Sequence, residues 1–285
     1  MSEPHAEMAA VISESATEAG GEDADVRAAG GEPGVAPAGA ERFELVTDDG
    51  VPMESLQHRH QMNLFIDVVT EALAARGRRD CYLSGNQFVY YSLEQAEFVA
   101  THAPDKYQHL IGPDVFFVDH VSPDPRGAWV VWKEHGRYPD VIVELLSPST
   151  RSNDYGPKKE RYERLFRTEE YYLYEPHGEH FDAFHLGSDG RYHAAPRDPR
   201  GWVWSPRFEL WIGTWHGAHG RFGEATSWLR CYDADGTLIR SPLELAEAER
   251  KRAEAERKRA EAERKRADAA ERELERLRAE LARRG

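Results

Sequence analysis

Short runs of β-branched and aromatic residues between residues 81 and 146 constrain the fold of this chain more than any other feature. Each run is bounded by Gly, Pro or Asp, which is typical of β-strands. The runs are CYLSGNQFVYYS, GPDVFFVDHV, AWVVWKE and YPDVIVELL. An amphipathic helix is predicted before them, over residues 58–77, because Leu64, Val68 and Ala72 repeat at i,i+4 spacing and Gly77 ends the pattern. This order predicts a mixed α/β domain with a central sheet.

The segments that follow extend the same pattern. Residues 147–156, SPSTRSNDYG, are predicted to be a loop, and residues 157–166, PKKERYERLF, a short helix with Pro157 in its first turn. EEYYLYEP and HFDAFHL are predicted strands, and residues 201–239, with five tryptophans, indicate further β-structure. The tryptophans could stack on nucleic-acid bases, but no basic patch is interleaved with them, so packing is the favoured interpretation.

Both ends of the chain differ in composition from the middle. Residues 1–42 hold nine acids and two arginines and are rich in Ala, Gly and Pro, so we predict a disordered acidic tail. Residues 244–285 contain the heptad AEAERKR three times, with Glu and Lys at i,i+4, which predicts a charged helix. The folded domain is therefore predicted to span residues 43–243.

The heptads leave two interpretations of this helix open. Ala246 begins one core position that ends in leucines, but Glu249, Glu256 and Glu263 occupy the second core position. Charged core positions disfavour a coiled coil over the first three heptads. The helix is therefore either a solvated single helix held by ion pairs, or a coiled coil over its last two heptads. In the second case Leu274, Leu277 and Leu281 would join two copies of the chain into a homodimer.

Composition excludes several classes of protein. The formal net charge of −14 argues against a protein that coats nucleic acid through clustered basic charge. No run approaches the roughly 20 apolar residues of a membrane span, so an integral membrane protein is not expected. The two cysteines, Cys81 and Cys231, are too few for a disulfide framework, and the N-terminal residues do not resemble a secretory signal. We therefore expect a reduced, cytoplasmic setting.

One group of residues could carry metal-assisted chemistry. Asp114 opens one predicted strand, Glu144 lies inside another, and Lys158 opens the helix that follows. Two acids on neighbouring strands with a lysine nearby can hold Mg²⁺ and support phosphodiester hydrolysis. Acids at strand ends are common, however, and a structural role is the alternative. For Glu144, which sits in an apolar strand, that alternative is a buried ion pair with a lysine or arginine.

These residues also belong to motifs that resemble a known family. The motifs are GPDVFFV at 112–118, YPDVIVELLSPST at 138–150, Asp154, Lys158, Tyr162 and EYYLYEP at 170–176. They resemble the Uma2 family, of the PD-(D/E)XK restriction-endonuclease-like superfamily. The resemblance implies a restriction-endonuclease-like central mixed sheet flanked by helices. It also implies that Asp114 and Glu144 are the metal-binding acids.

The resemblance departs from the plain superfamily motif at the lysine, because position 146 is Leu146. Uma2 proteins share this departure, and Lys158 is the candidate replacement. Helical geometry places Lys158 on one face with Tyr162 and Leu165, turned toward the sheet, whereas Lys159 lies about 100° away and would pair with Glu163. A salt bridge without catalytic function is the alternative for Lys158.

One histidine and two acids are weaker candidates for the site. His58, in the first turn of the long helix, and Glu44 could add groups to the site, although a structural role is favoured for both. Asp140 shares the strand of Glu144 but is interpreted as a strand-start acid.

The sequence therefore predicts a Mg²⁺-dependent endonuclease, with Mn²⁺ as the alternative ion and DNA favoured over RNA as the substrate. The alternative function is an inactive nuclease-fold scaffold or binding module that assembles through its helical tail.

Overall fold

The computed structural model describes residue 45 and residues 55–101, 109–176, 180–220 and 222–284. The acidic segment 1–42, for which we predicted disorder, and Glu44, a weaker site candidate with a structural role favoured, lie outside these residues. The chain divides into two compact units. One comprises Met1–Gly217 with Thr226–Ile239, and the other Ala218–Ala225 with Arg240–Gly285.

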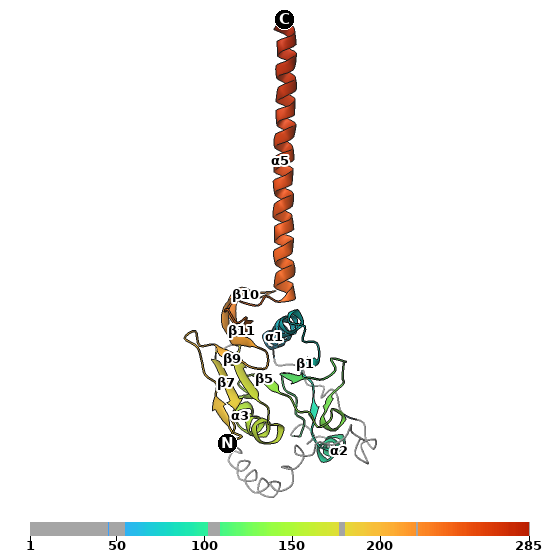
Figure 1. Cartoon of the computed structure of the whole chain (residues 1–285), viewed down its shortest axis with the longest axis vertical. Helices are drawn as coiled ribbons and strands as arrows, with labels where there is room; N and C mark the ends of the chain where they lie inside the picture. The colour runs from blue at the N-terminus through green and yellow to red at the C-terminus, as the bar shows by residue number, and fades with distance from the viewer. Residues whose placement is uncertain (1–44, 46–54, 102–108, 177–179, 221, 285) are drawn as a thin grey trace, which may run out of the picture. The chain divides into compact units, whose positions relative to one another are not determined.

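A six-stranded mixed sheet forms the centre of the first unit (Figure 1). Its strand order is β1-β3-β5-β6-β7-β8, and every neighbouring pair is antiparallel except β5 and β6. The strands are β1 (Cys81–Gly85), β3 (Val115–Asp119), β5 (Val141–Leu145), β6 (Glu170–Glu175), β7 (His180–Leu186) and β8 (Tyr192–Ala194). Because parallel strands need a crossover connection, the helical segment between β5 and β6 follows from this topology. The predicted central mixed sheet is confirmed.

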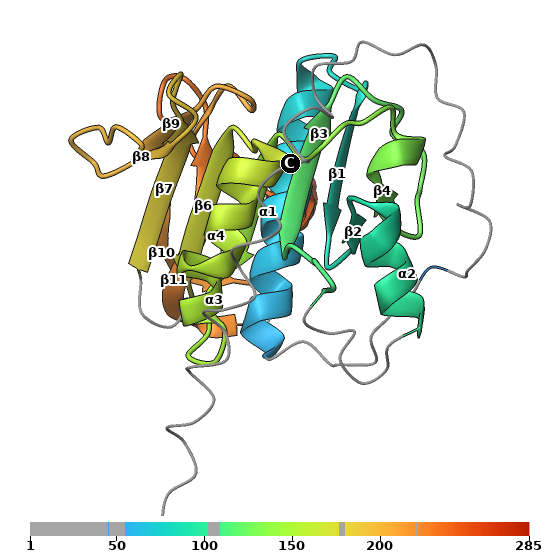
Figure 2. The same cartoon turned by 90° about the horizontal axis from the view of Figure 1, so that it is seen from below.

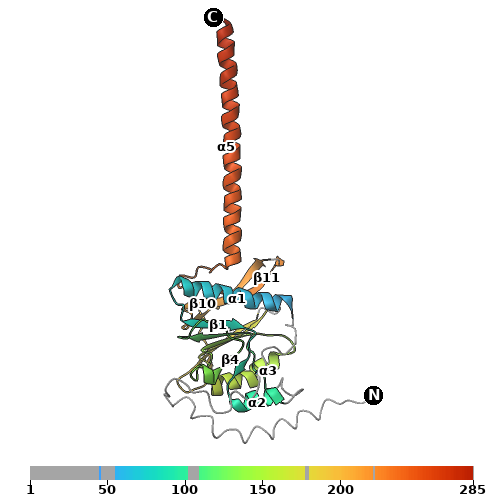
Figure 3. The ribbon, with the colours of Figure 1, turned by 90° about the vertical axis from the view of Figure 1, so that its right-hand side faces the viewer.

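Helices cover both faces of this sheet (Figures 2 and 3). One face carries α1 (Leu56–Ala75), and the other carries α3 (Arg151–Tyr155), α4 (Pro157–Arg161) and a π-helical turn at Tyr162–Phe166. Alternation along the strands explains both contacts. Ile142 packs in one core cluster with Tyr162 and Phe166 of the helical crossover. On the opposite face, the Phe117 ring contacts Phe208, which also contacts Phe65 of α1.

The start of α1 is fixed by a side-chain cap. Ser55 Oγ accepts the backbone N–H of His58 at 3.0 Å, which satisfies one of the free donors at the helix N-terminus. The helix consequently begins at Leu56, two residues before the predicted start. This cap places His58 in the first turn of α1, beside Asp114, the residue that immediately precedes β3.

Two sequence-based expectations are wrong in detail, and one helix was missed. The run AWVVWKE forms only the two-residue strand β4 (Trp129–Val130), which pairs in parallel with β2 (Val89–Tyr90) outside the main sheet and continues into a 3₁₀ turn at Val131–Lys133. The predicted loop 147–156 contains α3, because Ser147 and Thr150 bond to each other locally and Arg151 N–H donates to Ser147 C=O at 3.0 Å. The helix α2 (Leu93–Thr101) was not predicted.

A smaller sheet accounts for the tryptophan-rich segment. Its order is β11-β10-β9, with β9 (Val203–Ser205), β10 (Leu210–His219) and β11 (Phe222–Tyr232). The Trp202 ring stacks on Tyr232 with centroids 3.6 Å apart, and Trp204 contacts Trp211 edge to face. Trp228 is completely buried. These rings pack on neighbouring side chains, in agreement with the favoured interpretation.

The second unit contains the helix α5 (Pro242–Arg284) of 43 residues, none of them buried. A capping box begins it: Ser241 Oγ accepts the Glu244 N–H at 3.3 Å, and Glu244 Oε2 accepts the Ser241 N–H at 2.8 Å. The predicted charged helix is confirmed, and Lys258 pairs with Glu254 at 2.7 Å as expected. Within the described parts of the chain, no helix has both the length and the apolar character that crossing a bilayer requires.

A buried glutamine should be an important tie between α1 and β11. Gln61 is fully buried; its Oε1 accepts the Leu229 N–H at 2.8 Å and its Nε2 donates to the Leu229 C=O at 3.1 Å. Gln61→Ala leaves both backbone groups without a partner, so we expect a loss of about 2–4 kcal/mol in urea denaturation. Gln57→Ala is the matched control, because the Gln57 amide makes two longer contacts, at 3.3 and 3.4 Å, and is only partly buried. Equal losses in the two variants would contradict this assignment.

Candidate active site

The two predicted metal-binding acids lie opposite each other at one end of the sheet. β3 and β5 are antiparallel neighbours in which Val115 pairs with Val143, so the same register places Asp114 opposite Glu144. Side chains at directly opposed positions have Cβ atoms about 5 Å apart. The Asp114 N–H also donates to Glu144 Oε2 at 3.3 Å. The sequence prediction that these acids sit on neighbouring strands agrees with this geometry.

The two carboxylate oxygens of Asp114 contact two different elements, α1 and β5. Its Oδ1 lies 3.0 Å from Nε2 of His58, and its Oδ2 accepts the N–H of Leu145 at 2.7 Å. Burial alone would raise the pKa of the Asp114 carboxyl. The bond and charge of His58, the charge of Lys158 and the Leu145 N–H outweigh it, so the pKa lies below its ordinary value. Asp114 is therefore an ionised carboxylate at neutral pH.

Glu144 is the most deeply buried member of the site, with only 1% of its side chain exposed. Its Oε1 accepts the hydroxyl of Tyr162 at 2.9 Å and lies 3.1 Å from Nζ of Lys158. Burial raises the pKa of the Glu144 carboxyl to about 8; the Lys158 charge opposes this rise, and the Asp114 charge adds to it. A cation near Glu144 would therefore favour its ionised form.

Lys158 is shared between acids from a strand and from a helix. Its Nζ lies 3.1 Å from Glu144 Oε1 and 3.0 Å from Oδ1 of Asp154, four residues earlier on α3. The hydroxyl of Tyr171 donates to the Asp154 C=O at 2.8 Å and ties α3 to the sheet. Burial would lower the pKa of Lys158, but Glu144, Asp154 and Asp114 raise it above its usual range. The lysine therefore keeps its charge.

Carboxyl groups outnumber basic groups in this cluster. Three carboxyl groups, those of Asp114, Glu144 and Asp154, surround one ammonium group and one histidine. No group of three or more His, Cys, Asp or Glu side chains is arranged to hold a metal ion among the described residues. Mg²⁺, however, is often bound through one or two carboxylates and keeps several of its waters. Asp114 and Glu144 fit that requirement, because they are adjacent hard oxygen ligands and a bound cation would favour the ionised form of Glu144.

Asp140 occupies the structural position that the sequence predicted, whereas the contact predicted for Lys159 is not formed. Asp140 lies at the other end of β5, where its Oδ2 accepts the Asp119 N–H at 2.8 Å, as expected for a strand-start acid. The predicted pairing of Lys159 with Glu163 is wrong. Lys159 Nζ lies 3.4 Å from the centroid of the Phe184 ring, while Glu163 Oε1 accepts the Tyr192 N–H at 2.7 Å.

Two residues of the cluster were quoted in the sequence motifs without being assigned to the site. Tyr162 bonds to Glu144 and Asp154 pairs with Lys158, so both orient the central ion pair. The spacing Asp154, Lys158, Tyr162 is the signal that could have found them, because i, i+4 and i+8 share one helical face. The predicted loop over 147–156 obscured that signal.

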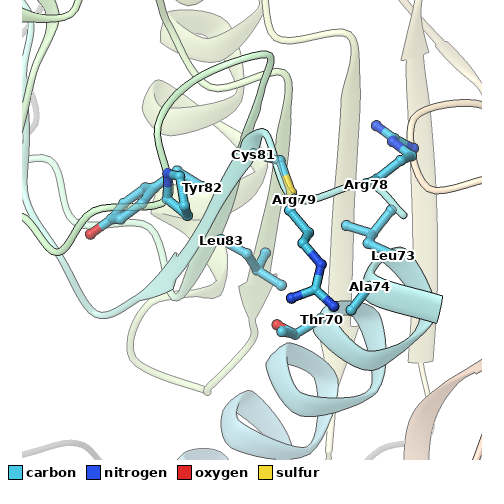
Figure 4. A pocket seen from close by; sticks show the side chains of 9 residues that line it. Thr70, Leu73, Ala74, Arg78, Arg79, Cys81, Tyr82 and Leu83 are labelled. Atoms are coloured by element: carbon cyan, nitrogen blue, oxygen red, sulfur yellow. The ribbon is translucent and has the colours of Figure 1, made fainter. Parts of the chain in front are cut away.

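A hollow of about 380 Å³ lies away from these acids (Figure 4). It is lined in part by Leu73, Leu83, Arg78 and Arg79, and no carboxylate contributes to its wall. Cys81 in this wall pairs with Asp119, at the opposite end of β3 from Asp114. The hollow and the acidic cluster are therefore separate features.

Comparison with known proteins agrees with the motifs. The family model of Uma2, described as "Putative restriction endonuclease", matches residues 37–214. The chain belongs to the Uma2 family.

A solved structure from Anabaena variabilis, described as a putative nuclease belonging to DUF820, is similar to this Uma2 chain at a TM-score of 0.39 and 13% identity. The similarity covers 55% of this chain and 76% of the other. No match was found among curated proteins.

The shared lysine gives a prediction that does not depend on activity. Lys158→Met should destabilise the metal-free protein by about 2–4 kcal/mol, because three buried or half-buried acids lose their cation. Lys159→Met should cost less than about 1 kcal/mol, since a thioether can keep the contact with the Phe184 ring. Urea denaturation with EDTA present measures both variants. A larger loss in Lys159→Met would show that the wrong lysine has been placed in the cluster.

Proposed function

We propose that this Uma2 protein is an endonuclease that hydrolyses nucleic-acid phosphodiester bonds with a divalent cation, Mg²⁺ or Mn²⁺, bound by Asp114 and Glu144. The observation that carries the proposal is the convergence of these two carboxylates with the charged amine of Lys158, 3.1 Å from Glu144. When bound, the cation would lower the pKa of a water molecule and offset charge on the phosphate oxygens. Nucleic acid is the substrate class, with DNA favoured over RNA.

Lys158 would interact with the reacting groups directly. Its side chain is 20% exposed, whereas that of Glu144 is 1% exposed, so Lys158 is the member of the ion pair that lies nearer to solvent. A fixed positive charge there would orient the attacking water or stabilise the charge that develops on the phosphate. Leu146 cannot do this, because it packs in the hydrophobic core.

His58, Tyr162 and Asp154 would act through the other three residues as positioning residues. His58 contacts Asp114 Oδ1 and leaves Oδ2 to the backbone of Leu145, which fixes the plane of that carboxylate. Tyr162 donates to Glu144, and Asp154 holds the amine of Lys158 from the side of α3. A carboxylate pair held in this way needs little rearrangement to bind a cation.

One observation favours a second candidate function. The contact between Glu144 and Lys158 is also what a buried structural ion pair would look like, and such a pair could be retained in an inactive scaffold or binding module. The two functions differ in cation binding and in cleavage, which can be measured separately.

Removing either acid should abolish cation binding and cleavage. Calorimetric titration with Mn²⁺ and nicking of supercoiled plasmid with Mg²⁺ are the two measurements, and Asp114→Asn and Glu144→Gln are the test variants. We expect cation affinity to fall at least tenfold and cleavage to fall at least a hundredfold, because each variant removes one of two charged ligands. Asp140→Asn, which changes an acid at the other end of β5, is the control and should behave as the wild type. Cation binding that is unchanged in Asp114→Asn would refute the ligand assignment.

Replacing the lysine should separate cleavage from cation binding. At saturating Mg²⁺, Lys158→Met is expected to cleave at least a hundredfold more slowly while its affinity for the cation is retained, since an ammonium group is not a metal ligand. Lys159→Met should change the rate less than threefold. If the wild type fails to cleave either DNA or RNA while Mn²⁺ still binds, the scaffold function is supported instead.

A further inference from the structure

The surface of α5 changes its chemistry along its length. In the first three heptads one core position is alanine and the other is glutamate, at Glu249, Glu256 and Glu263. After Arg266 both core positions are apolar as far as Leu281, with Ala267, Ala270, Leu274, Leu277 and Leu281, and Arg284 occupies the last one. The three leucines are exposed, at 48%, 46% and 71%. The helix thus presents an unpartnered apolar stripe only over its last part.

The charges that flank this stripe change at the same place. In a parallel, in-register pair of helices, a residue in position g faces the residue five positions later on the other helix. Over the repeats this juxtaposes like charges, Arg252 with Arg257 and Arg259 with Arg264. Beyond them it juxtaposes opposite charges, Arg266 with Glu271 and Glu273 with Arg278.

We propose that residues 266–284 of α5 form a parallel, in-register coiled coil with the same residues of a second copy of this chain, and that residues 242–265 remain unpaired. The apolar positions and the complementary charges begin together, and pairing of the repeats would bury glutamates and oppose arginines. An antiparallel pair that stacks Leu274 on Leu277 of the other copy would bring Glu271 near Arg278 but also Glu273 near Glu280, which is a pair of like charges, whereas both flanking pairs of the parallel arrangement have opposite charges. Charge complementarity therefore favours a second copy of this chain as the partner, with its helix parallel to the first.

The unpaired part is a stable helix without a partner. Glu254 pairs with Lys258 and Glu261 with Lys265, at 2.7 and 2.8 Å, and residues 249–265 around them are all exposed. These i,i+4 pairs stabilise an isolated helix. At 1.5 Å per residue, this part is a spacer roughly 36 Å long.

The first test measures the mass of the full-length chain by light scattering and sedimentation from 1 to about 500 µM. The wild type should approach the mass of a dimer, and Leu274→Lys with Leu277→Lys should weaken association at least tenfold. Leu243→Lys with Leu245→Lys is the matched control, since these leucines are 45% and 51% exposed at the beginning of the same helix. It should associate as the wild type does. A monomeric wild type at every concentration, a trimer, or equal losses in both variants would overturn the proposal.

The second test establishes the direction. Glu273→Arg and Arg278→Glu should each weaken association by threefold or more, because each places like charges at the g and e positions. The double variant exchanges the two charges and should return to within about twofold of the wild type. In the antiparallel register described above, Glu273→Arg would instead remove the repulsion with Glu280, so stronger association of this single variant would refute the parallel direction. Circular dichroism serves as the control that all variants keep the helix.

Discussion

The carboxyl group of Glu144 is buried near one end of the inner strand β5, and much of the surrounding structure offsets the cost of that burial. An isolated buried carboxylate is unfavourable by several kcal/mol unless it is paired. Lys158, the Tyr162 hydroxyl and the Asp114 N–H all contact it. Each comes from a different element, so the carboxylate can be satisfied only when the crossover helices dock on β5 and β3 pairs beside it. Local electrostatics and the global fold are therefore coupled at this residue.

The acids could be predicted from the sequence because strands impose few choices. Asp114 and Glu144 each lie at a definite place in an apolar run, and antiparallel pairing of those runs brings them together. The inward face of Lys158 followed from helical spacing alone. The contact of Lys159 with the Phe184 ring could not be predicted from helical spacing. Phe184 is on β7, which is distant in the sequence, and an aromatic ring face competes with an ion pair for the lysine.

Two elements were predicted wrongly from the sequence because hydrogen bonds of polar groups decide their local structure. The segment after β5 reads as a loop from its serines, yet those hydroxyl groups bond to one another and start α3. The run AWVVWKE has strand composition, but Trp129 is buried and its indole N–H donates to the Arg137 C=O, across a tight turn that ends the strand. Composition alone does not determine which of two local hydrogen-bonding patterns prevails.

The placement of Lys158 on a helix instead of a strand has a consequence for how the site is assembled. A lysine two residues after Glu144 would be fixed by the sheet itself and would persist as long as the sheet does. Here the amine depends on two short helices that meet at Gly156 and Pro157, a junction where proline cannot donate a backbone hydrogen bond. Segments of this kind open locally at a lower free energy than a central sheet. The cluster can thus lose Lys158, the cation that Glu144 and Asp154 share, while the strands that carry Asp114 and Glu144 remain folded.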